Sequence, residues 1–179
     1  MNDKQLVASC LQGDVEEFRR IVDKYRGKIM ALALNMLGNR EDAEDACQDA
    51  FVHAYQHLDQ FDDRRSFRTW LYTIVYNLCL DQLRKRHRFS KFFHRMKRES
   101  LSSAREQALK SSAGETLPMW MLKDLSPKER AAVFLWTVEG YTSEEIGSLL
   151  RCSPATARVH LYKARKKIKA LLERKNASM

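Results

Sequence analysis

Apolar residues recur every three or four positions through most of this 179-residue chain, a spacing that puts them on one face of a helix. Glycine and proline number only six and three, and no segment alternates apolar and polar residues as a half-buried strand does. The pattern therefore predicts an all-α fold class. It is clearest between Val15 and Leu37, where the residues in phase are Phe18, Ile21, Val22, Tyr25, Ile29, Leu32 and Met36.

Changes in composition divide the chain into two small helical domains. Residues 1–88 are expected to form the first domain and residues 117–179 the second. Residues 89–116 are rich in serine and have no clear apolar period, which is typical of a flexible linker. Part of the linker could be helical. The sequence defines no role for its Phe92 and Phe93.

Charged residues are segregated into blocks. The chain has 32 Lys and Arg against 23 Asp and Glu, a net charge of +9. Residues 41–63 hold eight acids and no Lys or Arg, residues 84–98 hold eight bases and no acid, and residues 151–175 hold nine bases and one acid. Basic blocks suit phosphates, whereas the acidic block suits a basic protein surface. We therefore expect both a nucleic acid and a protein partner.

Several functional classes are not expected from the sequence. No stretch of 18 apolar residues occurs, and the N-terminus does not resemble a signal peptide, so we expect a cytoplasmic protein without membrane insertion. The four cysteines form no CxxC pair. His53 and His57 are one helical turn apart, but a single helix cannot aim both of them and Cys47 at one ion. No metal, cofactor or catalytic residue is predicted.

A pair of short helices joined by a tight turn is expected at about 142–150 and 154–172. Thr142 and Glu145 can form a capping box for the first helix, and Ser153 can cap the second. Such a pair is typical of a helix-turn-helix, whose second helix enters the major groove of DNA. A basic helix that only solubilises a bundle is the alternative. The buried face of the second helix is expected to hold Ala157, Leu161, Ala164 and Ile168.

The aromatic helix before the first basic block is a candidate site for an opened DNA strand. Phe67 and Trp70 have the spacing of core residues. Tyr72, Tyr76 and Asn77 are expected to face outward, beside basic side chains, where aromatic rings can stack on unpaired bases.

Together, these motifs resemble the extracytoplasmic-function group of the sigma-70 family of bacterial RNA polymerase. The resemblance extends over about residues 5–172 in order and spacing. It implies a sigma factor, which binds core polymerase and directs it to promoters in response to a stress or envelope signal, and which is not an enzyme. The matching stretches are DAEDACQDAF at 42–51, FRTWLYTIVYN at 67–77, LSPKER at 125–130 and GYTSEEIG at 140–147, followed by the basic helix.

The resemblance also implies contact residues. In the family, region two binds a coiled coil of the polymerase's largest subunit, here through Asp42, Glu44, Asp45, Gln48, Asp49 and Phe51. Minus-ten recognition, with a base flipped into the loop at 61–65, would fall to Phe61, Asp62, Asp63, Arg64, Arg65, Asn77 and Arg84. Region four would read the minus-thirty-five element with Ala155, Thr156, Arg158, Val159, Tyr162, Lys163 and Lys166. The polymerase flap and an anti-sigma factor are further implied partners. Val159 replaces the small polar residue common in the family, which leaves the preferred DNA sequence open.

Two other functions fit the sequence less well. A helix-turn-helix regulator of the two-component or quorum-sensing type would carry an α/β receiver or a ligand-binding domain, and residues 1–90 show neither strands nor a phosphate-acceptor pattern. An enzyme acting on nucleic acid would need a second carboxylate cluster beside the acids at 41–49, and none is evident.

Overall fold

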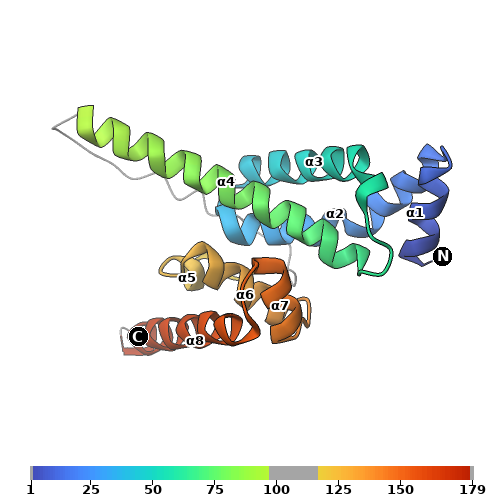
Figure 1. The fold of residues 1–179 in the computed structure, drawn as a ribbon. Coiled ribbons are helices and arrows are strands. Elements are labelled where there is room, and N and C mark those ends of the chain that lie inside the picture. Colours follow the sequence, from blue (N-terminus) through green and yellow to red (C-terminus); the bar gives the residue numbers. More distant parts are fainter. Residues whose placement is uncertain (1, 97–116, 178–179) are drawn as a thin grey trace.

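The computed structural model describes residues 2–96 and 117–177, which form an N-terminal unit (2–96) and a C-terminal unit (117–177) (Figure 1). The N-terminal unit contains α1 (Asp3–Leu11), α2 (Val15–Leu37), α3 (Arg40–Gln56), the 3-10 turn η1 (Leu58–Gln60) and α4 (Phe67–Met96). The C-terminal unit contains α5 (Met119–Leu122), α6 (Pro127–Thr137), α7 (Ser143–Leu150) and α8 (Pro154–Ala177). The all-α fold class is confirmed, since the described residues include no strand.

Local capping sets the ends of most of these helices. Gly38 ends α2 in the left-handed conformation (φ 69°), which a residue without a Cβ adopts at little cost. The side chain of Asn39 then caps α3 by accepting a hydrogen bond from the Asp42 amide. The capping box predicted at Thr142 forms before α7, and a second capping box forms at Ser126 before α6.

The core of the N-terminal unit follows the predicted helical stripes. Ile21, Ile29 and Leu32 of α2 are fully buried. Ala43, Ala50 and Ala54 form a fully buried side of α3. Phe67 of α4 is also a core residue, as predicted. Because α2, α3 and α4 each contribute an apolar stripe, they pack as a bundle.

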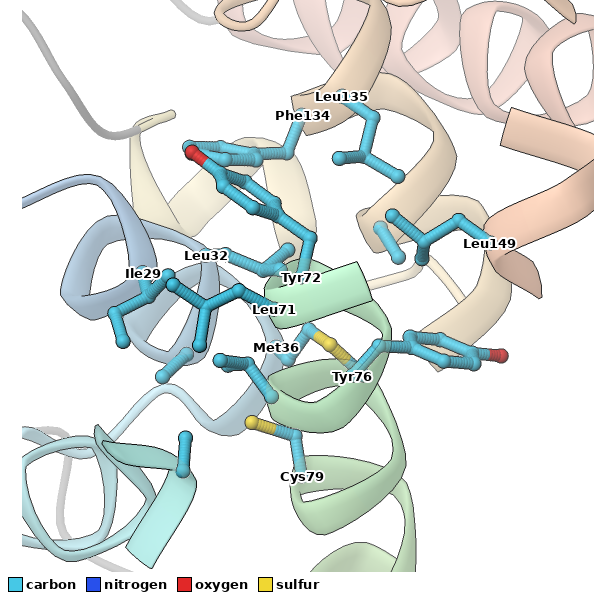
Figure 2. Close-up of a cluster of buried hydrophobic side chains, with 14 of the residues drawn as sticks. Ile29, Leu32, Met36, Leu71, Tyr72, Tyr76, Cys79, Phe134, Leu135 and Leu149 are labelled. Carbon is cyan, nitrogen blue, oxygen red and sulfur yellow. The ribbon is translucent and has the colours of Figure 1, made fainter. Parts of the chain in front are cut away.

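The expected outward position of two aromatic residues is wrong. Tyr72 and Tyr76 are 0% and 2% exposed. Their side chains join a continuous apolar cluster with Phe134, Leu135 and Leu149 of the C-terminal unit (Figure 2). The helical period of α4 could not reveal this burial, because part of the surrounding cluster comes from the other unit, including Tyr141, whose ring lies 6.0 Å from the Tyr72 ring between centroids.

The two units pack directly against each other. In Figure 1, α5 to α8 lie along one side of the N-terminal unit, and the contacting pairs are α2 with α6 and α4 with α7. The sequence predicted two domains and a linker, but it contained no sign of this packing. The closed arrangement is therefore a finding of the structure alone.

The helix α4 is longer than the predicted first domain. It continues to Met96, eight residues beyond the boundary expected at residue 88. The side chains of Phe92 and Phe93, and the rest of the expected linker from residue 97, lie outside the described part of the chain. Among the described residues, no helix is long and apolar enough to cross a membrane.

Candidate DNA and polymerase interfaces

The turn between α7 and α8 is closely packed. Arg151 ends α7 in the left-handed conformation (φ 53°), and the Cys152 amide donates to the Gly147 carbonyl at 2.8 Å. A Cβ on Gly147 would lie 2.8 Å from the Cys152 carbonyl oxygen, so glycine permits this close approach. Ser153 then caps α8, its hydroxyl accepting from the Thr156 amide at 3.1 Å. This geometry confirms the predicted helix-turn-helix.

The helix α8 has one buried and one basic face. Ala157 and Ala164 are fully buried, Leu161 is 9% exposed, and Ile168 packs against the same core. The exposed face holds all the residues predicted to read the minus-thirty-five element, which are Ala155, Thr156, Arg158, Val159, Tyr162, Lys163 and Lys166. A helix whose exposed face is basic matches the phosphates that flank a major groove.

An aromatic residue beside this face had no predicted role. Trp136 of α6 is 46% exposed, and the guanidinium carbon of Arg165 lies 5.7 Å from the centre of its ring. An open groove between α6 and α8 is lined by Trp136, Arg158, Leu161, Tyr162, Arg165, Lys166 and Lys169. Trp136 follows the apolar residues Val133, Phe134 and Leu135 in the sequence, so only the structure shows that its indole is at the surface.

The outer face of α3 is acidic. Glu44, Asp45, Gln48 and Asp49 are exposed on it, and they are four of the six residues predicted to contact core polymerase. Arg40 pairs with Glu44 at 2.7 Å. Asp45 and Asp49, the other acids of this face, are exposed, so a basic partner can reach them.

The remaining two predicted polymerase contacts lie elsewhere. Phe51 is a core residue, 9% exposed. Asp42 faces α4, where its carboxylate accepts a hydrogen bond from Gln82 Nε2 at 2.8 Å and pairs with Arg86. Both residues therefore hold the helix bundle together and are not part of the outer face of α3.

Two apolar residues on the outer face of α3 were missed. Val52 and Tyr55 are 55% and 48% exposed, and the Tyr55 ring packs edge-on against Phe18 at 4.9 Å between centroids. They follow Gln48 by four and seven residues, a spacing that places all three on one face. This spacing was available in the sequence and could have identified them.

The predicted base-capturing loop is held by its own side chains. The Phe61 ring packs on Phe67 and Trp70, each at 5.3 Å between centroids. The Asp62 carboxylate accepts from the Arg64 amide at 3.1 Å and from Arg64 Nε at 2.9 Å, and these hydrogen bonds lower the pKa of Asp62. The loop residues with exposed side chains are Asp63, Arg64 and Arg65.

The other predicted minus-ten residues lie on α4. Asn77 is half-buried, and Arg84 is exposed and pairs with Asp81 at 3.0 Å. Asn77 and Arg84 are seven residues apart, about two helical turns, so they share a face of α4. His53 and His57 stack at 4.2 Å between centroids, and nowhere in the described chain do three potential ligands group around a metal-sized site.

Family models match both units. Sigma-70 region 2 matches residues 21–89, and sigma-70 region 4 matches residues 121–168. The ECF RNA polymerase sigma factor SigW of Bacillus subtilis is 46% identical over 83 residues, which are 46% of this chain and 44% of that protein. The RNA polymerase sigma-H factor of Pseudomonas aeruginosa is 29% identical over 184 residues, covering 96% of this chain and 94% of that one.

Solved structures share the fold. CnrH in complex with the cytosolic domain of CnrY has a TM-score of 0.70 at 24% identity, covering 96% of this chain and 97% of that one. The sigma factor RpoE of Bartonella quintana, in complex with the anti-sigma factor NepR, has a TM-score of 0.69 at 24% identity, covering 88% and 98%. Because the two family models match both helical units in order, and relatives named as sigma factors align over nearly the whole length, the chain belongs to the extracytoplasmic-function group of the sigma-70 family.

Proposed function

We propose that this sigma factor binds core RNA polymerase through the outer face of α3 and reads promoter DNA with α8, α4 and the loop at 61–65. In this proposal, region two corresponds to residues 1–88 and region four to residues 117–179, joined by the linker at 89–116. The chain acts in the cytoplasm by binding, and the chemistry of RNA synthesis is left to the polymerase.

The separation of charge between α3 and α8 carries the proposal. The exposed acids of α3 would repel DNA, so they suit a basic surface of a protein partner. Val52 and Tyr55 add an apolar centre to that face, and the cores of protein interfaces are commonly apolar and aromatic. The exposed bases of α8 have the opposite preference and suit phosphates. The two partners therefore bind different surfaces and can be bound together.

Promoter reading is divided between the units. On α8, Arg158 can make a two-pronged hydrogen bond to guanine, and Val159 offers only apolar contact, for instance with a thymine methyl. On the N-terminal unit, Asn77 and Arg84 of α4 would lie along the opened strand of the minus-ten element. The exposed side chains of the loop at 61–65 would hold a flipped base.

An anti-sigma factor is the proposed regulator, in response to a stress or envelope signal. Support comes from the solved RpoE structure, which is a complex with the anti-sigma factor NepR. The groove beside Trp136 and the apolar centre at Val52 and Tyr55 are exposed surfaces that a protein inhibitor could cover.

The DNA reader is tested with single substitutions on α8. Arg158→Ala should weaken promoter binding by about 1–3 kcal/mol and relax base preference at one position. Lys163→Ala should weaken binding to all sequences alike and lower the salt slope of the binding constant by about one. Holoenzyme affinities for mapped promoters, measured over a salt series, separate the two effects.

The matched control is Lys123→Ala, which removes an exposed lysine of the C-terminal unit outside α8. It should bind as the unchanged protein does. If Arg158→Ala and Lys163→Ala also bind promoters with unchanged affinity and salt slope, α8 is not the reader of the upstream element.

A further inference from the structure

The last part of α4 extends beyond the helix bundle (Figure 1). Among the side chains that the structure describes, Arg86 is the last of α4 to pair with another helix, through Asp42 of α3. Residues 87–90 are all exposed, and the side chain of Phe89 is 65% exposed. The helix continues to Met96, so ten residues lengthen it by about 15 Å after the last such pair. This end of α4 is open to an external partner.

The residues of this segment have an amphipathic order. Phenylalanine and methionine occupy positions 89, 92, 93 and 96, which have the i, i+3, i+4 and i+7 spacing of one helix face. The bases Arg88, Lys91 and Arg95 have the spacing i, i+3 and i+7, which belongs to a different face. Residues 87–96 include no acid. The spacing therefore gives this end of α4 one aromatic face and one basic face.

An anionic membrane surface matches this order better than a nucleic acid does. A helix with Lys and Arg on one face and Phe on another is typical of segments that lie in the interface of a bilayer. The apolar face enters the boundary between headgroups and acyl chains, and the basic residues reach the lipid phosphates. A protein that binds an opened strand presents aromatic rings and bases on the same side, because both contact one strand. After Arg86, the spacing in α4 assigns them to different faces.

We propose that residues 87–96 of α4 bind peripherally to membranes that contain anionic phospholipid. The aromatic face meets the lipid interface, and the basic face meets the headgroup phosphates. The rest of the N-terminal unit stays outside the bilayer, because the apolar stripes of α2, α3 and α4 are already buried against one another. This binding goes beyond the proposed function, since polymerase docking and promoter reading are proposed for other residues.

Co-sedimentation of the full chain with lipid vesicles tests the proposal. One vesicle is phosphatidylcholine alone, and the other contains equal parts of phosphatidylcholine and phosphatidylglycerol. The partition coefficient should be about tenfold or more higher for the anionic vesicle, because each Lys or Arg near an anionic surface contributes about fivefold. Added salt should weaken the binding to the anionic vesicle, since it screens these charges.

Two variants separate the contributions of the two faces. The serine variant, with Ser at positions 89, 92 and 93, keeps the charge. It should lower the partition coefficient about tenfold or more, since binding scales with the apolar area that enters the interface. The glutamine variant, with Gln at positions 88, 91 and 95, keeps the aromatic face. It should lose most of the preference for phosphatidylglycerol.

Each variant has a control that makes the same kind of change elsewhere in the N-terminal unit. Leu11→Ser with Val15→Ser replaces two apolar side chains that are 53% and 63% exposed. Arg19→Gln, Arg26→Gln and Lys28→Gln together remove three exposed bases of α2, so the net charge changes as in the glutamine variant. Both controls should bind vesicles as the unchanged chain does.

Equal partitioning of the unchanged chain into the two vesicles overturns the proposal, and so does equal binding by the serine variant and its control. If the serine variant keeps its vesicle binding but binds core polymerase more weakly, the aromatic face docks on a protein. If it keeps its vesicle binding but binds single-stranded DNA more weakly, the face contacts nucleic acid. Either result also overturns lipid binding. Circular dichroism checks folding, and Phe89→Ser alone makes the same comparison if the serine variant does not fold.

Discussion

At the scale of single residues, Glu129 shows how one side chain can serve two elements. It is 4% exposed, and its Oε2 accepts from the Ser126 amide at 2.8 Å and from Lys167 Nζ at 2.7 Å. It therefore closes the capping box of α6 and also ties α6 to α8. Burial alone would raise the pKa of Glu129, but the hydrogen bonds from Lys167 and Ser126 outweigh it and lower the pKa below its usual value.

Glu129→Gln should lower the free energy of unfolding by about 1.5–3 kcal/mol at pH 7, because hydrogen bonds to a charged group are lost. A lowered pKa in the folded state stabilises the fold above the unfolded-state pKa of about 4.3, and the stabilisation is lost as pH falls through the folded-state value. The difference between the variant and the unchanged chain should therefore shrink below about pH 4. Urea unfolding of the variant and the unchanged chain, at pH 7 and below about pH 4, measures this difference in stability. Glu173→Gln is the control, since its carboxylate is exposed and 3.9 Å from Lys169. Equal stability of the Glu129 variant and the control at pH 7 contradicts the assignment.

At the scale of elements, α3 has different partners on its two sides. Its inner side is bound to α4 through Asp42, Gln82 and Arg86. Its outer side presents Asp45 and Asp49 to solvent. Acids from one short motif therefore divide between contacts inside the helix bundle and the proposed polymerase interface.

Reversing the outer charges, with Asp45→Lys and Asp49→Lys together, should abolish binding to core polymerase and leave the folding stability nearly unchanged. A basic partner surface would then face two like charges. Pull-down with core polymerase and thermal unfolding measure the two properties. The control reverses Glu16 and Asp23, which are exposed acids of α2 outside the proposed interface. Retention of core polymerase by the α3 variant at the level of the control rules out this face as the docking site.

At the scale of the whole molecule, we expect promoter opening to need both units and the polymerase. The free chain should bind duplex promoter DNA weakly, because its reading surfaces are held together in the closed arrangement. With core polymerase, the DNA near the start site should open, and the exposed side chains of the loop at 61–65 would then receive a base. In the proposed function, the polymerase would hold the two units at the spacing of the two promoter elements.

Replacing Asp63, Arg64 and Arg65 by Gly and Ser should spare holoenzyme assembly and upstream binding but block strand opening. Phe61 and Asp62 are retained because they anchor the loop to α4 and fix its turn. Permanganate reactivity of unpaired thymines measures the opening, and footprinting of the upstream element serves as the control. Normal reactivity in this variant shows that strand opening depends on other residues.

The sequence alone determined the helices, their caps and the faces of the helix-turn-helix. Apolar period and capping act within a few residues, so the bounds of α2, the cap at Asn39 and the buried face of α8 could be predicted. Because these patterns act only over a few residues, they do not show which side chains are buried by tertiary packing. The sequence shows that Phe51 is apolar and Asp42 is acidic. Whether these side chains face a neighbouring helix or the solvent depends on how α3 packs against the rest of the unit.

Only the tertiary structure decided how the two units meet. Tyr72 and Tyr76 are buried in a cluster that includes residues of the C-terminal unit, and the Tyr72 ring lies 6.0 Å from the Tyr141 ring between centroids. In the sequence, nothing distinguishes Arg68 from the other basic residues. Its hydrogen-bond acceptors in the structure are 71 and 73 residues further along the chain. Contacts over such separations depend on the packing of complete surfaces. No local pattern encodes that packing, so these contacts between the units could be found only in the folded chain.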